Sequence, residues 1–340
     1  MELIERVDID EKEVRRFVES NPGGNLFQMP EFLKVLDRTK DYEGNWAGLR
    51  ESGELVGSVL FYDIKDKTPV PGFSVTRRIV MGGPLVKGEN QQEVEERIKE
   101  LLDHVVNAGK KPLFVEVRNL SDLSSDAKAF ESCGFEFEDH LNFLFDITEG
   151  EEGLMRQMTS SGRRMVKKSL SGNLRVSSAK DISEVDSFYQ ILHGSYEAKG
   201  IPIADISLFR ACFDVLGDSH CKFLLAKDQS DNIIAGRLEL IGAGSMYDWY
   251  AAALPEALSL RPNELLVWSA FQEAIRTGLA RFDFGGAGRP DEKYGVREFK
   301  EKFGGERVNF GRYILITKRL TMQLASKGYE LKKKMRSRPS

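Results

Sequence analysis

A lysine close to the carboxy-terminal end of the chain is the residue best suited to do chemistry. Residues 298–305 read Glu-Phe-Lys-Glu-Lys-Phe-Gly-Gly, with Lys300 in third place. A fixed lysine cation could stabilise negative charge that develops on a substrate oxygen more strongly in the transition state than in the ground state. The alternative is a surface lysine of a short helix, because Arg297 and Lys302 are also charged.

Two segments before this lysine carry groups that could line a site. Residues 247–253 read Tyr-Asp-Trp-Tyr-Ala-Ala-Ala and predict a strand, on which Trp249 and Tyr250 would point to opposite faces. Residues 282–289 read Phe-Asp-Phe-Gly-Gly-Ala-Gly-Arg, and their glycines would let backbone approach a ligand or another strand closely. Core packing and a structural turn explain the same patterns, so both interpretations stay open.

Other residue types give weaker signals. Asn263 precedes an apolar helical pattern, where its side chain would either cap the helix or meet a ligand. The four histidines lie far apart in sequence, and no metal-ligand spacing such as His-Glu-x-x-His is present. The sequence therefore predicts neither a Ser/His/Asp set nor a metal site.

The composition indicates a folded protein of two domains. The chain has 340 residues, of which 41% are hydrophobic and 30% charged. This length suits two domains of about 150 residues each. A net charge of -4 argues against a generally basic DNA-binding chain. The acidic amino terminus and the lack of a run of roughly 20 apolar residues predict a cytoplasmic protein without a signal peptide or transmembrane segment.

The two halves of the chain repeat one pattern of elements. Residues 45–63 and 223–241 each read as two strands around a polar turn, with Gly57 and Gly236 at matching places. A helix, a strand, a closing segment and a last strand follow in each half, the last strands being 140–147 and 309–317. Such a repeat predicts a duplicated domain with a mixed α/β sheet. We place the domains at 1–148 and 153–318, and a basic helix or tail at 319–340.

The series of motifs resembles the FemABX (methicillin-resistance FemAB) aminoacyltransferases. Residues 25–34 match an opening Phe-Gln-x-Pro-Glu-aromatic motif, and residues 298–305 match a closing Phe-Lys-x-x-Phe-Gly motif. An aromatic strand, an Asn at a helix start and an Asp-x-Gly-Gly strand end lie between them. The resemblance covers nearly the whole chain and implies two tandem GNAT-type acyltransferase domains.

The resemblance also implies roles for individual residues. Lys300 and Tyr250 would be catalytic, and Lys34 would contact the diphosphate of a nucleotide-linked precursor. The expected substrate-binding residues are Lys34, Arg164, Lys199, Tyr247, Trp249, Asn263, Asp283, Gly285, Gly286 and Arg289.

The implied activity is transfer of an aminoacyl group from aminoacyl-tRNA to an amine of a nucleotide- or lipid-linked cell-envelope precursor, as in peptidoglycan bridges, with no separate cofactor. The Arg/Gln-x-x-Gly-x-Gly/Ala loop of coenzyme A-dependent relatives is not evident, but the second repeat also lacks room for a tRNA-binding helical arm. Acetyl-CoA-dependent N-acyl transfer to an amine, sugar or lipid and a non-catalytic binding protein are therefore the alternatives. The basic residues 332–338 would allow RNA or peripheral membrane contact.

Overall fold

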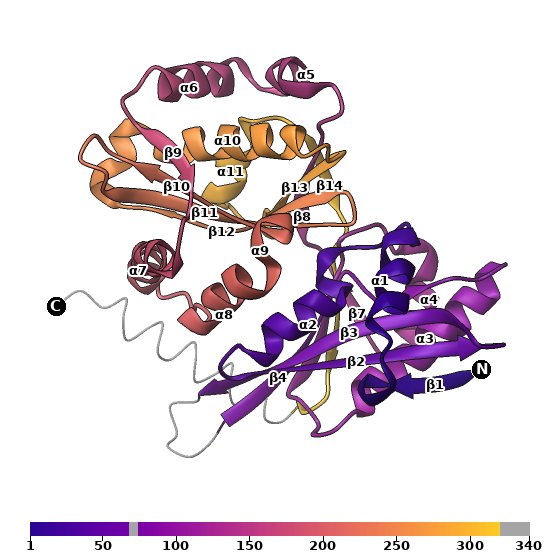
Figure 1. The fold of residues 1–340 in the computed structure, drawn as a ribbon. Coiled ribbons are helices and arrows are strands. Elements are labelled where there is room, and N and C mark those ends of the chain that lie inside the picture. Colours follow the sequence, from indigo (N-terminus) through magenta and orange to yellow (C-terminus); the bar gives the residue numbers. More distant parts are fainter. Residues whose placement is uncertain (68–73, 320–340) are drawn as a thin grey trace. The chain divides into compact units, whose positions relative to one another are not determined.

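The computed structural model describes residues 1–67 and 74–319 and divides into two compact units (Figure 1). Of the described residues, unit 1 holds 1–33, 41–67, 74–138 and 311–319, and unit 2 holds 34–40 and 139–310. Residues 320–340, nearly all of the predicted basic tail, lie outside the described residues. None of the helices within the described ranges is long and apolar enough to cross a membrane.

Unit 1 contains a mixed sheet with the strand order β1-β2-β3-β4-β6-β15-β7, and β5 pairs with β3. Only β4 and β6 run parallel among the pairs that the described residues form in this sheet. The strands are β1 (Glu2–Glu5), β2 (Tyr42–Glu51), β3 (Glu54–Lys67), β4 (Ser74–Met81), β5 (Leu85–Val86), β6 (Phe114–Arg118), β7 (Glu136–Glu138) and β15 (Arg312–Ile316). The helices are α1 (Glu11–Ser20), η2 (Leu26–Gln28), α3 (Gln91–Asn107) and α4 (Ala127–Ser132), and the helix α2 (Pro30–Asp37) begins in unit 1 and ends in unit 2.

Unit 2 contains a second mixed sheet, with the order β14-β8-β13-β12-β11-β10-β9. Figure 1 shows α5, α6, α10 and α11 on one face of this sheet and α7 and α8 on the other. The strands are β8 (Leu141–Asp146), β9 (Arg175–Ser178), β10 (Cys221–Lys227), β11 (Ile233–Gly242), β12 (Ser245–Ala253), β13 (Arg281–Gly286) and β14 (Glu306–Asn309). The helical elements are α5 (Gly150–Gln157), α6 (Ser160–Leu170), α7 (Ile182–Lys199), α8 (Ile206–Ala211), η4 (Cys212–Leu216), α9 (Gly217–His220), η5 (Pro255–Leu260), α10 (Pro262–Arg276) and α11 (Gly295–Glu301).

Both predicted hairpins are present, one in each sheet. β2 and β3 pair antiparallel around Ser52 and Gly53, whose φ angles of 52° and 87° suit a tight turn. β10 and β11 form the equivalent hairpin in unit 2. Gly236 of β11 is needed there for packing, because a Cβ at this position would lie 2.4 Å from the ring of Phe188. The predicted fold class, a mixed α/β protein with tandem units, is confirmed.

The apolar stripes predicted from helical spacing face the two cores. On α3, Ile98, Leu101 and Val105 are fully buried and belong to the unit 1 core that includes Phe61 and Val117. In unit 2 the helix α10 packs on β10, β11 and β12. The hydrophobic core of unit 2 is rich in aromatic side chains, which are Phe145, Trp268, Phe271, Phe282, Phe284 and Phe303. Each unit therefore has its own hydrophobic core.

The two sheets exchange their last strands. β8 pairs with β13 and β14 of unit 2, although it follows unit 1 in the chain. β15 pairs with β6 and β7 of unit 1, although it follows unit 2. This differs from the expectation that each half keeps its own last strand, at 140–147 and 309–317. Sequence order alone could not show the exchange, because either sheet accepts an apolar strand at that position.

Candidate active site

The parallel strands β12 and β13 pair over only a short length. Ser245, Met246 and Tyr247 lie opposite Arg281, Phe282 and Asp283, and the ladder stops there. β12 continues against β11, with a bulge at which Tyr250 pairs with Leu238 and Asp248 with Glu239. Trp249 is the extra residue of this bulge. The strict alternation predicted for Trp249 and Tyr250 is therefore wrong, and their rings lie 5.2 Å apart.

Lys300 lies beside the end of β13 and is buried, with 6% of its surface exposed. It belongs to α11, and its ammonium group donates hydrogen bonds to the carbonyl oxygens of Phe284 and Gly286. The Nζ atom also lies 4.9 Å from the centre of the Phe284 ring. An ammonium group has three N–H donors, so these two bonds leave one for a further acceptor. The alternative of a surface lysine is excluded by this burial.

Asp283 and Gly285 shape the turn that Lys300 holds. The buried Asp283 carboxylate accepts a hydrogen bond from the Gly285 amide at 2.7 Å. Gly285 has a φ of 73°, and a Cβ there would lie 3.0 Å from the carbonyl oxygen of Asp248. Only glycine allows this close approach of β13 to β12 without strain. Gly286 likewise faces His140, whose Nε2 would lie 2.7 Å from an added Cβ.

An ion-pair cluster that the sequence analysis missed lies in the same part of the sheet. Arg237 donates to Glu239 at 2.9 Å and pairs with Asp248 at 2.6 Å. All three side chains are at least nine-tenths buried. Arg237 also lies over the Phe284 ring, 5.3 Å from its centre, so two cations flank one ring. The available signal was an Arg-x-Glu pair inside an apolar strand, because spacing of two residues places both charges on one face.

Burial changes the protonation of this cluster. Burial and then the charge of Asp248 raise the pKa of Glu239 to about 8, against the effect of Arg237. Burial also raises the pKa of Asp283 to about 6, while the Gly285 amide and Lys300 oppose the rise. Burial lowers the pKa of Lys300, and Asp248 opposes that change. With a pKa of about 8, Glu239 is mainly protonated at pH 7.

A cluster of aromatic side chains from β12, α7 and α8 lies beside the ion-pair cluster's strand β12. The Tyr250 ring is 5.0 Å from that of Phe209 and 6.2 Å from that of Tyr196. Burial raises the pKa of Tyr196 to about 12, and the charge of Asp248 adds to the rise. Tyr247 is buried in the sheet, and burial raises its pKa as well. Of the predicted site residues, Lys300, Asp283, Gly285, Gly286 and Tyr247 therefore lie together at the β12–β13 junction, and Trp249 and Tyr250 follow on β12.

Other predicted binding residues occupy exposed positions. Lys34 is exposed on α2, and Arg164 is exposed on α6. Lys199 ends α7 and donates to the Ser195 hydroxyl at 3.2 Å. Arg289 follows β13 and contacts Asp291 at 3.4 Å. A ligand-binding role for these four cations stays a prediction.

Asn263 does not cap the helix at whose start it stands. The N-cap of α10 is Arg261, Pro262 is the first helical residue, and Asn263 is the second. The Arg261 backbone has a φ of 59°, which is uncommon for a residue other than glycine. The capping role considered for Asn263 is therefore wrong, and its binding role stays a prediction.

The opening motif at residues 25–34 builds structure in unit 1. The buried Gln28 amide donates to the Leu60 and Met81 carbonyls at 3.0 and 2.8 Å and accepts from the Leu60 amide at 2.7 Å. Asn25 donates to the Gly82 carbonyl at 2.7 Å. These bonds join η2 to β3 and β4, so Gln28 and Asn25 have a structural explanation.

Comparisons with known proteins agree with this geometry. Residues 155–301, all within unit 2, match the family described as the acetyltransferase (GNAT) domain. The structure of FemX superposes with a TM-score of 0.73 and 16% identity, covering 95% of this chain and 99% of that one. The chain has the tandem acyltransferase fold of FemX. The predicted FemABX-like fold and the acyltransferase class are thereby confirmed.

Two further solved structures have the same fold at lower similarity. One is L-PGS from Bacillus licheniformis, with a TM-score of 0.56 and 15% identity, covering 94% of this chain and 96% of that one. The other is a tandem GNAT protein from the clavulanic acid biosynthesis pathway, with a TM-score of 0.56 and 10% identity, covering 92% and 98%. A search of curated protein sequences finds no match.

Proposed function

We propose that this FemX-like protein transfers an aminoacyl group from aminoacyl-tRNA to an amine of a cell-envelope precursor. The observation that carries the proposal is the buried Lys300 ammonium, fixed by two carbonyl groups at the end of β13. In the reaction, the amine nitrogen attacks the ester carbonyl carbon, a C–N bond forms and the C–O bond to the tRNA breaks. The leaving hydroxyl takes the proton that the amine loses.

Lys300 would stabilise the transition state of this reaction through its third N–H. Negative charge develops on the carbonyl oxygen when the amine attacks, and a preorganised donor in a dry site stabilises that charge strongly. The buried cluster of Arg237, Glu239, Asp248 and Asp283 would keep the ammonium in place. Tyr250 would border the reacting groups from β12. Lys34, Arg164 and Lys199 would contact the anionic parts of the substrates.

The nature of the acceptor rests on the neighbours in fold. FemX and the C-terminal domain of a putative lysylphosphatidylglycerol synthetase from Agrobacterium fabrum share this architecture, the latter with a TM-score of 0.56 and 13% identity. The name of the synthetase describes a product in which a lysyl group is attached to a lipid. This supports an aminoacyl donor and an acceptor of the cell envelope for the present protein. A nucleotide- or lipid-linked muropeptide is the acceptor that we propose, in the cytoplasm where charged tRNA is made.

The second candidate is coenzyme A-dependent N-acyl transfer. It is favoured by the match of residues 155–301 to the acetyltransferase domain. Ligand stabilisation separates the two candidates, because a ligand that binds only the native state raises stability by about 2.7 kcal/mol at a hundredfold excess over Kd. We expect stabilisation by charged tRNA and by a UDP-linked muropeptide. Stabilisation by acetyl-CoA alone would overturn the proposal in favour of the second candidate.

A further inference from the structure

Two cations of α11 bond to the backbone of the chain that leads into this helix. Lys300 donates to the carbonyl oxygens of Phe284 and Gly286 at the end of β13. Arg297 lies one helical turn before Lys300, and its guanidinium donates to four further carbonyl oxygens. They belong to Ala287, Arg289, Pro290 and Glu292. We call residues 287–292 the β13–α11 segment.

The hydrogen bonds of the Arg297 guanidinium are directed at the backbone of this segment. They run from Nε to Ala287 at 3.0 Å, from Nη1 to Pro290 at 3.3 Å, and from Nη2 to Glu292 at 2.7 Å and to Arg289. A guanidinium has five N–H donors, so this side chain uses four of them here. Within residues 1–67 and 74–319, no carboxylate pairs with Arg297. Its charge therefore serves to hold backbone carbonyls and not an acidic side chain.

The β13–α11 segment needs such a restraint because it follows a glycine-rich strand end. Gly285 and Gly288 both have a φ of 73°, and glycine loses more backbone freedom on folding than any other residue. β8 ties the start of the segment, since the Ala287 amide donates to the Leu141 carbonyl at 2.6 Å and the Leu141 amide donates to Gly288 at 2.9 Å. From residue 289 onward, Arg297 bonds to three of the four carbonyl groups. Loss of the guanidinium should therefore loosen the segment.

The same backbone holds the Lys300 ammonium. The Gly286 carbonyl, which accepts from Lys300 at 3.0 Å, comes directly before the first residue of the segment. The Nζ atom also lies 3.7 Å from the position that a Cβ on Gly285 would take, so the ammonium fits closely against this stretch. A shift of the carbonyl would move the ammonium, and misplacement of a reacting group by about 1 Å can cost about a hundredfold in rate. Arg297 and Lys300 therefore act on one continuous stretch of backbone.

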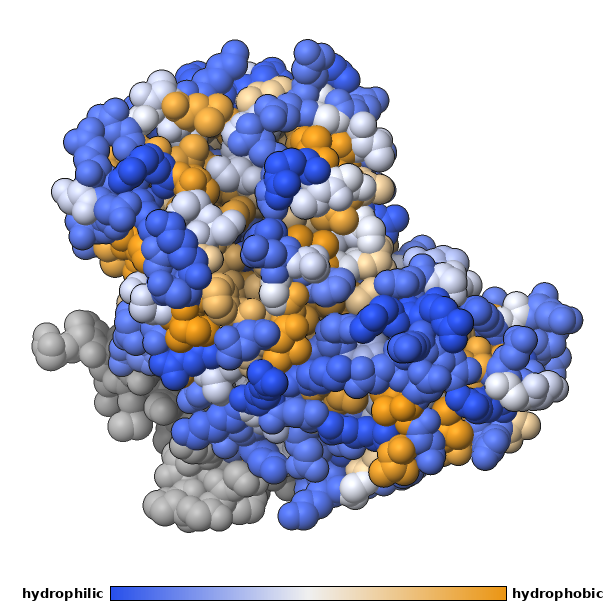
Figure 2. Space-filling view, in the orientation of Figure 1, coloured by the Kyte–Doolittle hydropathy of each residue, from blue (hydrophilic) through white to orange (hydrophobic). Residues whose placement is uncertain are grey.

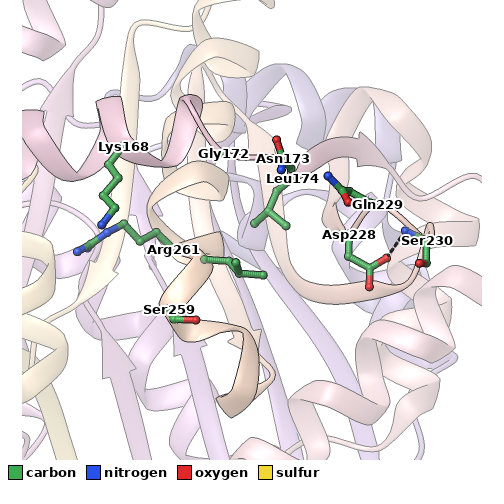
Figure 3. Close-up of a pocket in the computed structure, with 10 residues that line it drawn as sticks. Lys168, Gly172, Asn173, Leu174, Asp228, Gln229, Ser230, Ser259 and Arg261 are labelled. Atoms are coloured by element: carbon green, nitrogen blue, oxygen red, sulfur yellow. Dashed lines mark hydrogen bonds between the residues drawn. The ribbon is translucent and has the colours of Figure 1, made fainter.

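Arg297 is separate from the cavity of unit 2 that Figure 3 shows. That cavity has a volume of about 490 Å³, and its walls come from the end of α6 and the residues after it, the β10–β11 turn and the start of α10. Among the described residues, neither α11 nor the β13–α11 segment supplies a lining residue. A substitution of Arg297 thus changes the surroundings of Lys300 and leaves the lining of the cavity as it is.

We propose that Arg297 is a positioning residue for Lys300, which it places by fixing the β13–α11 segment and, through it, the Gly286 carbonyl. The inference rests on the proposed function, because Lys300 is the group that would stabilise charge on the reacting carbonyl. Arg297 itself contacts neither the substrates nor the reacting atoms in this scheme. It therefore affects the rate of the chemical step and not the affinity for substrates.

Steady-state transfer from charged tRNA to a UDP-linked muropeptide tests this role in the full-length protein. Arg297→Ala should lower kcat about tenfold and leave both KM values within about twofold, because the lost alignment matters in the transition state. The loss stays below that of Lys300→Met because Gly286 still pairs with Asn142 of β8. Free guanidinium ion at millimolar concentration should restore part of the rate of Arg297→Ala and none of the rate of Lys300→Met.

The double variant Arg297→Ala/Lys300→Met shows whether Arg297 acts through Lys300. We expect it to be no slower than Lys300→Met, since the effects of residues that act as a unit are not additive. The matched control is Arg163→Ala, because Arg163 also donates to backbone carbonyls, those of Met155 at 3.2 Å and Met158 at 2.6 Å. It belongs to α6, which lies at the upper edge of the face in Figure 2, where hydrophilic side chains predominate. This control should keep the wild-type kcat within about twofold.

Hydrogen exchange measures the restraint without any substrate. Exchange of the Ala287 and Glu292 amides should be at least about tenfold faster in Arg297→Ala and unchanged in Arg163→Ala. Unchanged exchange in Arg297→Ala, a rise in KM without a fall in kcat, or a double variant about tenfold slower than Lys300→Met would overturn the inference. If the wild-type protein transfers no aminoacyl group, the proposed function fails, and the exchange rates alone decide whether Arg297 fixes the segment.

Discussion

At the scale of single residues, the surroundings of Gly285 show that β13 lies very close to β12. Its φ is 73°, and an added Cβ would lie 3.0 Å from the Asp248 carbonyl oxygen. Gly278 has the same φ but open space around it. Both Gly285→Ala and Gly278→Ala should lose about 1 kcal/mol of stability, because alanine is unfavourable in the left-handed backbone conformation. We expect Gly285→Ala to lose about 1–2 kcal/mol more in urea unfolding, because the strands must shift. Equal losses would contradict the close approach.

The raised pKa of Glu239 predicts that the stability of the protein depends on pH. Its pKa is raised to about 8, against about 4.3 in an unfolded chain, because it is buried near Asp248. Between these values the native state binds one more proton than the unfolded state, so the free energy of unfolding should fall as pH rises from about 4.5 to 8. Glu239→Gln removes the titrating carboxyl group and keeps the shape of the side chain. Between about pH 4.5 and 8, the free energy of unfolding of this variant should therefore vary less than that of the wild type, by up to a few kcal/mol.

The matched control for this experiment is Glu292→Gln, since Glu292 is exposed. This control should follow the wild-type pH profile of urea unfolding. Asp283, with a pKa raised to about 6, adds a loss of the same sign between about pH 4 and 6 in every variant. If Glu239→Gln and the wild type had parallel profiles, Glu239 would be ionised in the native protein at neutral pH.

At the scale of elements, Gln28 joins η2 to two strands of unit 1. Its buried side chain makes three hydrogen bonds, to the Leu60 carbonyl and amide and to the Met81 carbonyl. Gln28→Ala would leave these backbone groups unpaired, at a cost of about 1–3 kcal/mol for each group that water cannot reach. We expect about 3 kcal/mol less stability in urea unfolding. The exposed Gln92→Ala on α3 should stay within about 0.5 kcal/mol of wild type.

The elements that periodicity defines were predictable, and the local departures from regular geometry were not. Helices α3 and α10 and both hairpins follow from apolar spacing and turn residues. The bulge at Trp249 and the left-handed Arg261 have no such signal. The burial of Lys300 was also hidden, because its sequence neighbours are charged. The ammonium can be buried there because it donates hydrogen bonds to the carbonyl oxygens of Phe284 and Gly286 at the end of β13, another element of the chain.

At the scale of the whole molecule, the exchange of β8 and β15 makes unit 1 depend on the carboxy-terminal end of the chain. The Tyr313 ring of β15 stacks on Phe130 at 4.0 Å, inside the unit 1 core. A fragment of residues 1–148 lacks this strand and keeps β8 without its sheet. We expect it to show no cooperative unfolding by circular dichroism.

A rearranged fragment provides the control for that experiment. Glu138 lies opposite Arg312 in the antiparallel pair of β7 and β15, so a two-residue Asn-Gly turn can join residues 138 and 312 as a hairpin. The chain 1–138 joined in this way to 312–340 should unfold cooperatively. A fragment 1–148 that was equally stable would contradict the exchange.

The account's central claim is that Lys300 serves aminoacyl transfer, and single-turnover transfer tests it most directly. The measurement follows labelled amino acid from charged tRNA to a UDP-linked muropeptide, with Lys302→Met as the matched control on the same segment. We predict transfer by wild type and control, and a loss of at least a hundredfold for Lys300→Met, about the loss of one oxyanion donor. Transfer by Lys300→Met at the wild-type rate, or wild-type transfer from acetyl-CoA alone, would contradict the account.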